Sequence, residues 1–160
     1  EYPHVVAPMV LADSTHPDQY PEFAKVLPAP RPDESAILKG LRDGPDLSGT
    51  REWVDFSANA ALVRKAGPIG DKPLIVLTRS PNWPGDGFVP DEWEKLVEPV
   101  HQRLQARLCT LSTRCRQVVA AHAGHNIQRD EPQLVMDAIV DVVRQVRSFN
   151  DSGGATSDKN

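Results

Sequence analysis

The chain has 160 residues, of which 39% are hydrophobic and 25% are charged, and its net charge at pH 7 is -4. These values are typical of a globular domain with a core, and they give no reason to expect nucleic acid or an anionic membrane as a partner. No apolar run approaches the roughly 20 residues that span a bilayer. No segment has the pattern of a signal peptide, so the compartment, cytoplasmic or secreted, stays open.

The first predicted element is a short strand over residues 9–12, which is apolar throughout, as expected of a strand buried on both faces. Asp13 follows it directly, so we expect its carboxylate at the carboxyl-terminal tip of that strand. The next part of the chain is the least regular. Five prolines between Pro17 and Pro32 predict extended, irregular structure there rather than a long helix.

Two short helices are predicted further along this irregular part. One lies within residues 33–44 and is closed by Gly44, and the other lies within residues 50–67 and is closed by Gly67. The second helix has an apolar stripe at helical spacing, for which packing is the simpler interpretation than ligand binding. Its members are Trp53, Phe56, Ala60 and Val63.

The rest of the chain alternates strands and helices. A second apolar strand is predicted over residues 74–78, then a loop rich in Pro and Gly, a helix over residues 91–108, and a third strand over residues 117–121. A turn with two histidines follows, and a last helix is predicted to start near Asp130 as its N-cap. Apolar strands alternating with amphipathic helices predict an α/β fold with a parallel sheet covered on both sides.

Three segments carry a resemblance to a known family. They read "VVAPMVLADSTHP", "GDKPLIVLTRS" and "VVAAHAGHNIQRDEPQLVMDAIVDVV", and they are similar to the sixth, seventh and eighth strands of α/β-hydrolases with the turns that follow. The last is the most specific, because it has a small residue, Gly, His, a polar stretch, Asp-x-Pro and then an apolar helix. The chain, up to about Arg147, therefore resembles the C-terminal half of this superfamily of esterases, lipases, peptidases and epoxide hydrolases.

The resemblance implies a division of the chain into four segments. Residues 1–13 would enter the sixth strand, residues 14–68 would form a cap-like insertion, and residues 69–148 would form the C-terminal core with the histidine turn. Residues 149–160 are a polar tail that we expect to be disordered. In the family the cap covers the active site and shapes substrate choice, so Tyr20, Trp53 and Phe56 either line a substrate pocket or pack the cap onto the body.

The resemblance also implies catalytic roles. Family triads run Ser, then Asp or Glu, then His in chain order, and His125 matches the histidine, as general base and then acid. His122 does not match, and a structural or surface role is the simpler interpretation. Two residues match the acid: Asp86, in "GDGFVP" after the seventh strand, and Asp13, at the tip of the sixth as in many haloalkane dehalogenases. The longer, proline-broken loop around Asp86 favours Asp13 slightly.

The nucleophile is not found in this chain. No G-x-S-x-G motif is present, the glycine-rich oxyanion loop is absent too, and Ser14, Ser80 and Ser112 each lie in the wrong context. Three strands are also few for such a sheet, and the apolar stripes would expose a large patch. We therefore expect a second polypeptide, the N-terminal half of the same hydrolase, to supply the serine, the oxyanion hole and the remaining strands.

The sequence thus favours a serine hydrolase of ester, thioester or amide bonds that acts on a small-molecule substrate and needs no metal or organic cofactor. A variant with an aspartate nucleophile would be an epoxide hydrolase or dehalogenase. The alternative from another class is a non-catalytic binding or interaction subunit with the same fold. Cys109 and Cys115 are six residues apart, which is not zinc-ligand spacing, and both a short disulfide and two free thiols stay open.

Overall fold

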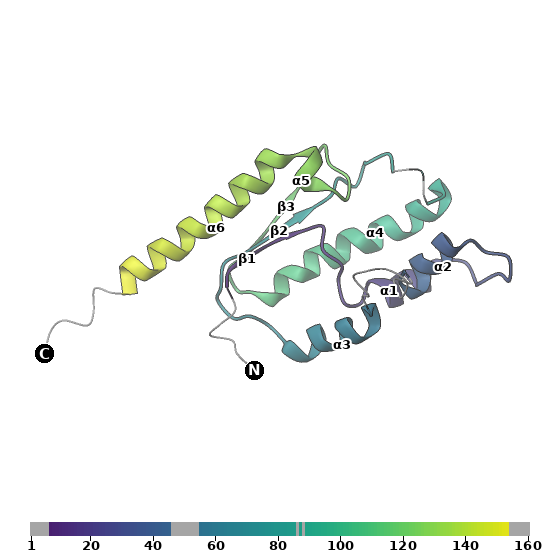
Figure 1. Ribbon diagram of the computed structural model, residues 1–160, viewed down its shortest axis with the longest axis horizontal. Coiled ribbons are helices and arrows are strands. Elements are labelled where there is room, and N and C mark those ends of the chain that lie inside the picture. Colours follow the sequence, from purple (N-terminus) through teal and green to yellow (C-terminus); the bar gives the residue numbers. More distant parts are fainter. Residues whose placement is uncertain (1–6, 46–54, 86, 88, 154–160) are drawn as a thin grey trace, which may run out of the picture. The chain divides into compact units, whose positions relative to one another are not determined.

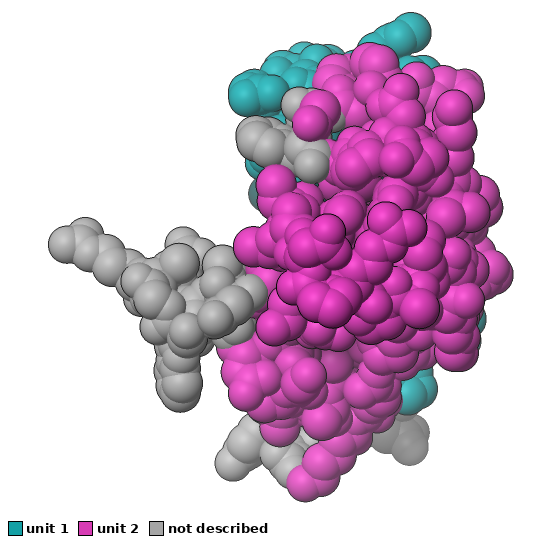
Figure 2. All heavy atoms as spheres, turned by 90° about the vertical axis from the view of Figure 1, so that its right-hand side faces the viewer, with its two compact units in different colours: residues 1–13, 68–80, 109–160 teal, residues 14–67, 81–108 magenta. Residues whose placement is uncertain are grey.

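The structure is a computed structural model that describes residues 7–45, 55–85, 87 and 89–153. The chain divides into two compact units (Figure 2). The first comprises residues 1–13, 68–80 and 109–160, and the second comprises residues 14–67 and 81–108. The second unit therefore contains the predicted cap-like insertion and, in addition, the loop and helix that follow the second strand.

The first unit contains a three-stranded parallel sheet in the order β1-β2-β3 (Figure 1), so the predicted α/β class with a parallel sheet is confirmed. Strands β1 (Met9–Ala12) and β2 (Leu74–Thr78) have the predicted bounds. Strand β3 spans Cys115–Val119, two residues earlier than predicted. The sequence pattern missed this start because the second residue of β3, Arg116, is charged and exposed, and it pairs with Asp141 at 2.8 Å.

The core of the first unit lies between the sheet and helix α6 (Pro132–Gly153). Ala138 and Val142 of this helix pack in one cluster with Ile75 and Leu77, and every residue of β2 is buried. Because α6 continues to Gly153, the predicted disordered tail is wrong for residues 149–153, which are helical. Residues 154–160 lie outside the described residues.

The start of the last helix also differs from the prediction. A short helix, α5 (Ile127–Asp130), precedes α6, so Asp130 ends one helix instead of capping the next. The reason is that the Asp130 carboxylate accepts a hydrogen bond from the backbone N–H of Gly124, in the histidine turn. An Asp before an apolar stripe is a common N-cap signal, but here the carboxylate accepts from the histidine turn and not from the first turn of the next helix.

The second unit consists of helices α1 (Gln19–Val26), α2 (Ala36–Asp43), α3 (Phe56–Ala66) and α4 (Asp91–Leu108). Helices α2 and α3 end before Gly44 and Gly67, as predicted. Helix α1 corrects the prediction of irregular structure for the first part of the proline-rich stretch, whereas residues 27–32 contain no helix or strand, as predicted. Its proline, Pro21, lies in the first turn, where a backbone N–H has no partner within the helix in any case.

The core of the second unit is formed where α1 packs against α4. The buried members of this cluster are Phe23, Leu27, Val97, Val100 and Leu104. A second, polar contact joins Arg42 of α2 to Glu34, with 2.6 Å between Nη1 and Oε1, and the Arg42 guanidinium also lies 5.8 Å from the centre of the Trp93 ring.

A disulfide joins Cys109 to Cys115 in the first unit, which resolves the alternative left open by the spacing. Cys109 begins a short 3-10 helix, η1 (Cys109–Leu111), and Cys115 begins β3. The bond therefore closes a tight loop immediately before the last strand. Among the helices of the described residues, none is long and apolar enough to cross a membrane.

Candidate functional site

Asp13 lies at the carboxyl-terminal edge of the sheet, directly after β1. Its backbone N–H donates to the carbonyl of Leu77 at 2.8 Å, so the hydrogen bonding of the ladder continues to this residue. Its φ is +43°, in the left-handed region, which Asp enters more readily than most residues because its short side chain bonds locally. The chain thus turns away from the strand direction at Asp13.

The carboxylate of Asp13 joins the ends of the other two strands. Oδ1 accepts a hydrogen bond from the backbone N–H of Arg79, which follows β2, at 3.2 Å. Oδ2 lies 2.9 Å from Nδ1 of His125, in the turn that follows β3. The Asp13 side chain is only 1% exposed, whereas the His125 side chain is 68% exposed. A buried carboxylate therefore holds one nitrogen of an imidazole whose ring is open to solvent.

The histidine turn is held by carboxylates from the α5 segment. The backbone N–H of Gly124 donates to Oδ2 of Asp130 at 3.0 Å, and the backbone N–H of His122 donates to Oε1 of Glu131 at 2.7 Å. Charge-assisted bonds of this kind are stronger than neutral ones. They fix the backbone at two positions just before His125 and so limit where its ring can lie.

The same turn is also tied to the end of β2. Ser80 donates its backbone N–H to the carbonyl of Ala123 at 3.0 Å, and Ala123 and Ile127 are fully buried in the core cluster. The turn is therefore anchored by packing below and by hydrogen bonds at its sides, while the ring of His125 is exposed.

The contact with Asp13 determines the tautomer that this geometry favours. An ionised carboxylate is only an acceptor, so the His125 proton in the neutral ring belongs on Nδ1, and the lone pair belongs on Nε2. An imidazole in this form can take a proton at Nε2, and the carboxylate stabilises the imidazolium that results. This is the chemistry of a general base oriented by an acid.

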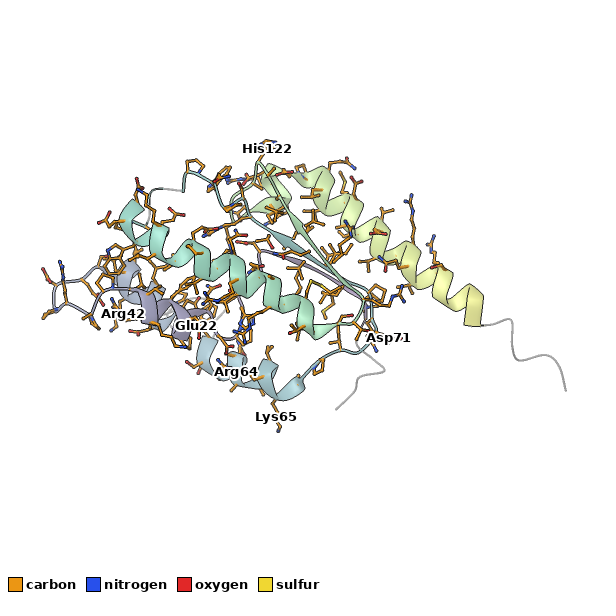
Figure 3. The ribbon with its side chains drawn as sticks, turned by 180° about the vertical axis from the view of Figure 1, so that it is seen from behind. Glu22, Arg42, Arg64, Lys65, Asp71 and His122 are labelled. Carbon is orange, nitrogen blue, oxygen red and sulfur yellow. A yellow bond between two sulfur atoms is a disulfide. The ribbon has the colours of Figure 1, made fainter. Side chains whose placement is uncertain are left out.

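The structure thus brings together two of the three predicted site residues, Asp13 and His125. The third, Asp86, lies outside the described residues. His122 is exposed near the tip of the turn (Figure 3), and its ring has no part in the contact between Asp13 and His125. Ser112 is buried and its hydroxyl donates to the carbonyl of Lys72.

Sequence reasoning missed the groups that position the pair. The Arg79 backbone amide gives no sequence signal, because any residue except proline supplies the same donor. The two carboxylates of Asp130 and Glu131 did give a signal, since they follow His125 by five and six residues, but Asp130 was assigned to the wrong role. Their bonds to turn amides make them positioning residues.

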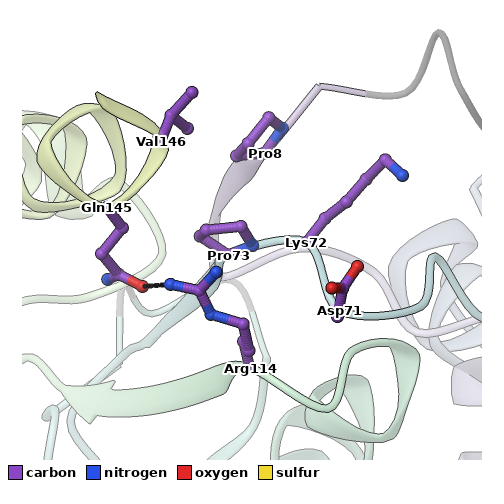
Figure 4. Close-up of a pocket in the computed structure, with 7 residues that line it drawn as sticks. All are labelled: Pro8, Asp71, Lys72, Pro73, Arg114, Gln145 and Val146. Atoms are coloured by element: carbon purple, nitrogen blue, oxygen red, sulfur yellow. Dashed lines mark hydrogen bonds between the residues drawn. The ribbon is translucent and has the colours of Figure 1, made fainter. Parts of the chain in front are cut away.

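A cavity of about 170 Å³ lies at the opposite, amino-terminal ends of the strands (Figure 4). Pro8 and Pro73 form part of its wall, and the Arg114 guanidinium donates to Oε1 of Gln145 in α6 at 3.3 Å. The carboxyl ends of parallel strands all lie at the same end of the sheet, where Asp13 and His125 meet. This cavity therefore lies at the opposite end of the sheet from that pair. It is therefore a separate feature of the same unit.

The described residues contain no group of three or more His, Cys, Asp or Glu side chains that could hold a metal ion. Comparisons of the chain with profiles of protein families, with curated proteins and with solved structures found no match. The geometry of the site is therefore the basis for the function proposed next.

Proposed function

We propose that this chain is the C-terminal half of an α/β-hydrolase and supplies the base and the acid of a Ser-Asp-His triad. In this proposal His125 is the general base and then the general acid, and Asp13 is the residue that orients it. The serine and the oxyanion hole come from an N-terminal half, and the reaction is hydrolysis of an ester, thioester or amide bond in a small molecule.

One observation carries the proposal: the 2.9 Å contact between Oδ2 of Asp13 and Nδ1 of His125. The two residues are 112 positions apart in the chain, and each follows a different parallel strand at the same edge of the sheet. An acid that meets the Nδ1 side of a histidine, and leaves the ring exposed for a nucleophile, is the arrangement a triad requires. It favours Asp13 over Asp86 as the acid.

Two further observations support a missing half. Within the described residues β1 pairs only with β2, so its outer edge is open to another strand. Helix α6 also has an exposed apolar stripe, whose members are 42% to 51% exposed. The stripe consists of Met136, Ile139, Val140 and Val143. The open side of β1 and the exposed apolar stripe of α6 are features expected if strands of an N-terminal half continue the sheet.

The test begins with the protein isolated from its natural source by an antibody against this chain. Intact mass spectrometry under denaturing conditions identifies every polypeptide present, and a fluorophosphonate probe labels an activated serine. We expect a polypeptide or a longer form of this chain that contains G-x-S-x-G and takes the label, and we expect His125→Ala to abolish labelling.

Two outcomes would overturn the proposal. If the chain occurs only as a folded 17.6 kDa species with no second half, it lacks a nucleophile and the non-catalytic alternative takes its place. If a G-x-S-x-G half is present and labels equally well with His125→Ala, the histidine is not the base. His122→Ala serves as the matched control, because it removes the other histidine of the turn, whose ring takes no part in the contact between Asp13 and His125.

A further inference from the structure

The second unit has a cavity of about 200 Å³ that the proposed hydrolase site does not include. Its wall combines the start of α1 and the segment before it with one face of α3. The apolar part of this wall contains Tyr20, Phe56, Ala60 and Val63, with the rings of Tyr20 and Phe56 packed edge to face at 5.5 Å between centroids. An apolar cavity of roughly 150 Å³ is large enough to hold benzene.

His16 is a polar residue of this cavity wall, and one of its two ring nitrogens has no hydrogen-bond partner among the described residues. Its side chain is 8% exposed, and its Nδ1 accepts a hydrogen bond from the backbone N–H of Asp18 at 3.0 Å. Among the described residues, nothing accepts a hydrogen bond from its Nε2. His16 is therefore a cavity-lining side chain that is nine-tenths buried and has a donor, Nε2–H, that no described residue uses.

The tautomer of His16 follows from the same contacts. Nδ1 also lies 3.9 Å from Oδ2 of Asp18, which would be an ion pair if the ring were protonated. The shorter bond from the Asp18 backbone N–H excludes a proton on Nδ1, however, and burial lowers the pKa of His16 more than the Asp18 carboxylate raises it. The neutral ring thus carries its proton on Nε2.

The charged groups beside the cavity satisfy one another. Asp18 accepts hydrogen bonds from Arg64 at 2.9 Å and from Arg107 at 3.2 Å, and Arg64, labelled in Figure 3, also donates to the carbonyl of Pro17. An ionic ligand would have to compete with these bonds. Thr15 and Asn59, the other polar residues of the wall, are exposed to solvent, so the buried polar side chain of the wall that needs an acceptor is His16, at its Nε2–H.

We propose that this cavity binds an uncharged, mainly apolar molecule of about the size of a substituted benzene ring, which carries one hydrogen-bond acceptor, such as a carbonyl oxygen, for Nε2 of His16. The apolar wall supplies most of the affinity, and the hydrogen bond selects ligands with an acceptor. This site does not depend on the hydrolase proposal, because its test requires no turnover.

The test uses two probes that differ only in the acceptor, acetophenone and ethylbenzene. They are titrated into the 160-residue chain, and binding is followed by the NMR signals of the His16, Tyr20 and Phe56 rings. We expect saturable shifts with acetophenone and an affinity about five- to tenfold lower for ethylbenzene, the loss that corresponds to one buried hydrogen bond. Benzoate should bind worse than acetophenone, because its charge would be buried.

Paired variants separate the two nitrogens of His16. In His16→Asn the amide oxygen takes the place of Nδ1 and keeps the bond from Asp18, but the donor at Nε2 is lost. In His16→Gln the amide nitrogen takes the place of Nε2 and keeps the donor. We expect the preference for acetophenone to disappear in His16→Asn and to persist in His16→Gln.

A second pair tests the place of binding. Ala60 lines the cavity, so Ala60→Leu fills it and should abolish binding, whereas Ala61→Leu changes an exposed position of the same helix and should not. Equal affinities for the two probes, or no saturable shift with either, would overturn the proposal. Unchanged binding in Ala60→Leu would overturn it as well, because the ligand would then lie elsewhere.

Discussion

Asp13→Asn is the most informative perturbation of the proposed active site. Asparagine keeps the shape of the side chain but has one acceptor where Asp13 has two in use, toward the backbone N–H of Arg79 and toward Nδ1 of His125. If its oxygen accepts from Arg79, its amide nitrogen faces His125 and donates. The imidazole must then present a lone pair at Nδ1 and carry its proton on Nε2, which is the wrong form for a general base.

The size of the effect follows from the geometry. Charge centres about 4 Å apart interact by about 4 kcal/mol at an effective dielectric of 20 and by about 1 kcal/mol in water. Asp13 is buried and His125 is exposed, so their attraction lies between these limits. Losing it would slow formation of the imidazolium by roughly five- to a thousandfold, since about 1.4 kcal/mol is tenfold. The wrong tautomer adds to this, so we expect a total loss of about 10³- to 10⁴-fold.

The assay has two parts. The rate is measured as hydrolysis of a chromogenic ester by this chain together with the proposed N-terminal half. ¹⁵N NMR of the His125 ring identifies which nitrogen carries the proton. Asp86→Asn is the control for the rival acid, and it should keep the rate within about threefold. If Asp13→Asn retained more than a tenth of the rate while Asp86→Asn lost most of it, the assignment of the acid would be refuted. An unchanged tautomer in Asp13→Asn would refute the structural reasoning itself.

Three further predictions concern stability, measured by urea or thermal unfolding. Replacing Cys109 and Cys115 by serine should cost about 2 kcal/mol, or roughly 5–8 °C, because the short disulfide loop limits the entropy of the unfolded chain; an unchanged transition would show that the bond does not form in solution. Arg42→Ala should cost about 3–5 kcal/mol by leaving Glu34 buried without its cation, and the double variant Arg42→Met with Glu34→Gln should recover most of it. The lowered pKa of His16 means that the unfolded state takes up a proton first, so stability is fully present above the unfolded value of 6.5 and is lost as pH falls below it. His16→Asn should flatten the stability profile between pH 7 and pH 5, and an equally steep profile would contradict that origin.

The sequence predicted the sheet well because β1 and β2 are unbroken apolar runs, and such runs leave few alternatives. It placed β3 two residues late because Arg116, the second residue of that strand, is charged and exposed and interrupts the apolar pattern. Only the first part of the proline-rich stretch was assigned wrongly, because counting prolines ignores that Pro21 lies in the first turn of α1, where its missing N–H is not needed.

The candidate site was predictable only as far as strand order allows. Asp13 and His125 were each placed at a strand end from local pattern and resemblance, but their contact depends on backbone geometry that no residue type specifies. The unused donor of His16 was not predictable at all. It lies in the wall of a cavity that residues of α1 and α3 also line, and a histidine beside proline in an irregular segment has no pattern that marks it.

The geometry of the sheet gives a last argument about why Asp13 and His125 meet. They follow β1 and β3, which flank β2 and are therefore roughly 9–10 Å apart at two strand spacings. Two devices close that gap: the left-handed backbone of Asp13, and the bond from the Ser80 amide that draws the histidine turn toward the end of β2. This contact adds little to the stability of the fold. An ion pair with one exposed partner contributes weakly, and burying the carboxylate is unfavourable. Because the pair is weak as a structural contact and requires a buried carboxylate, a chemical role of the exposed His125 ring explains it better than a structural role.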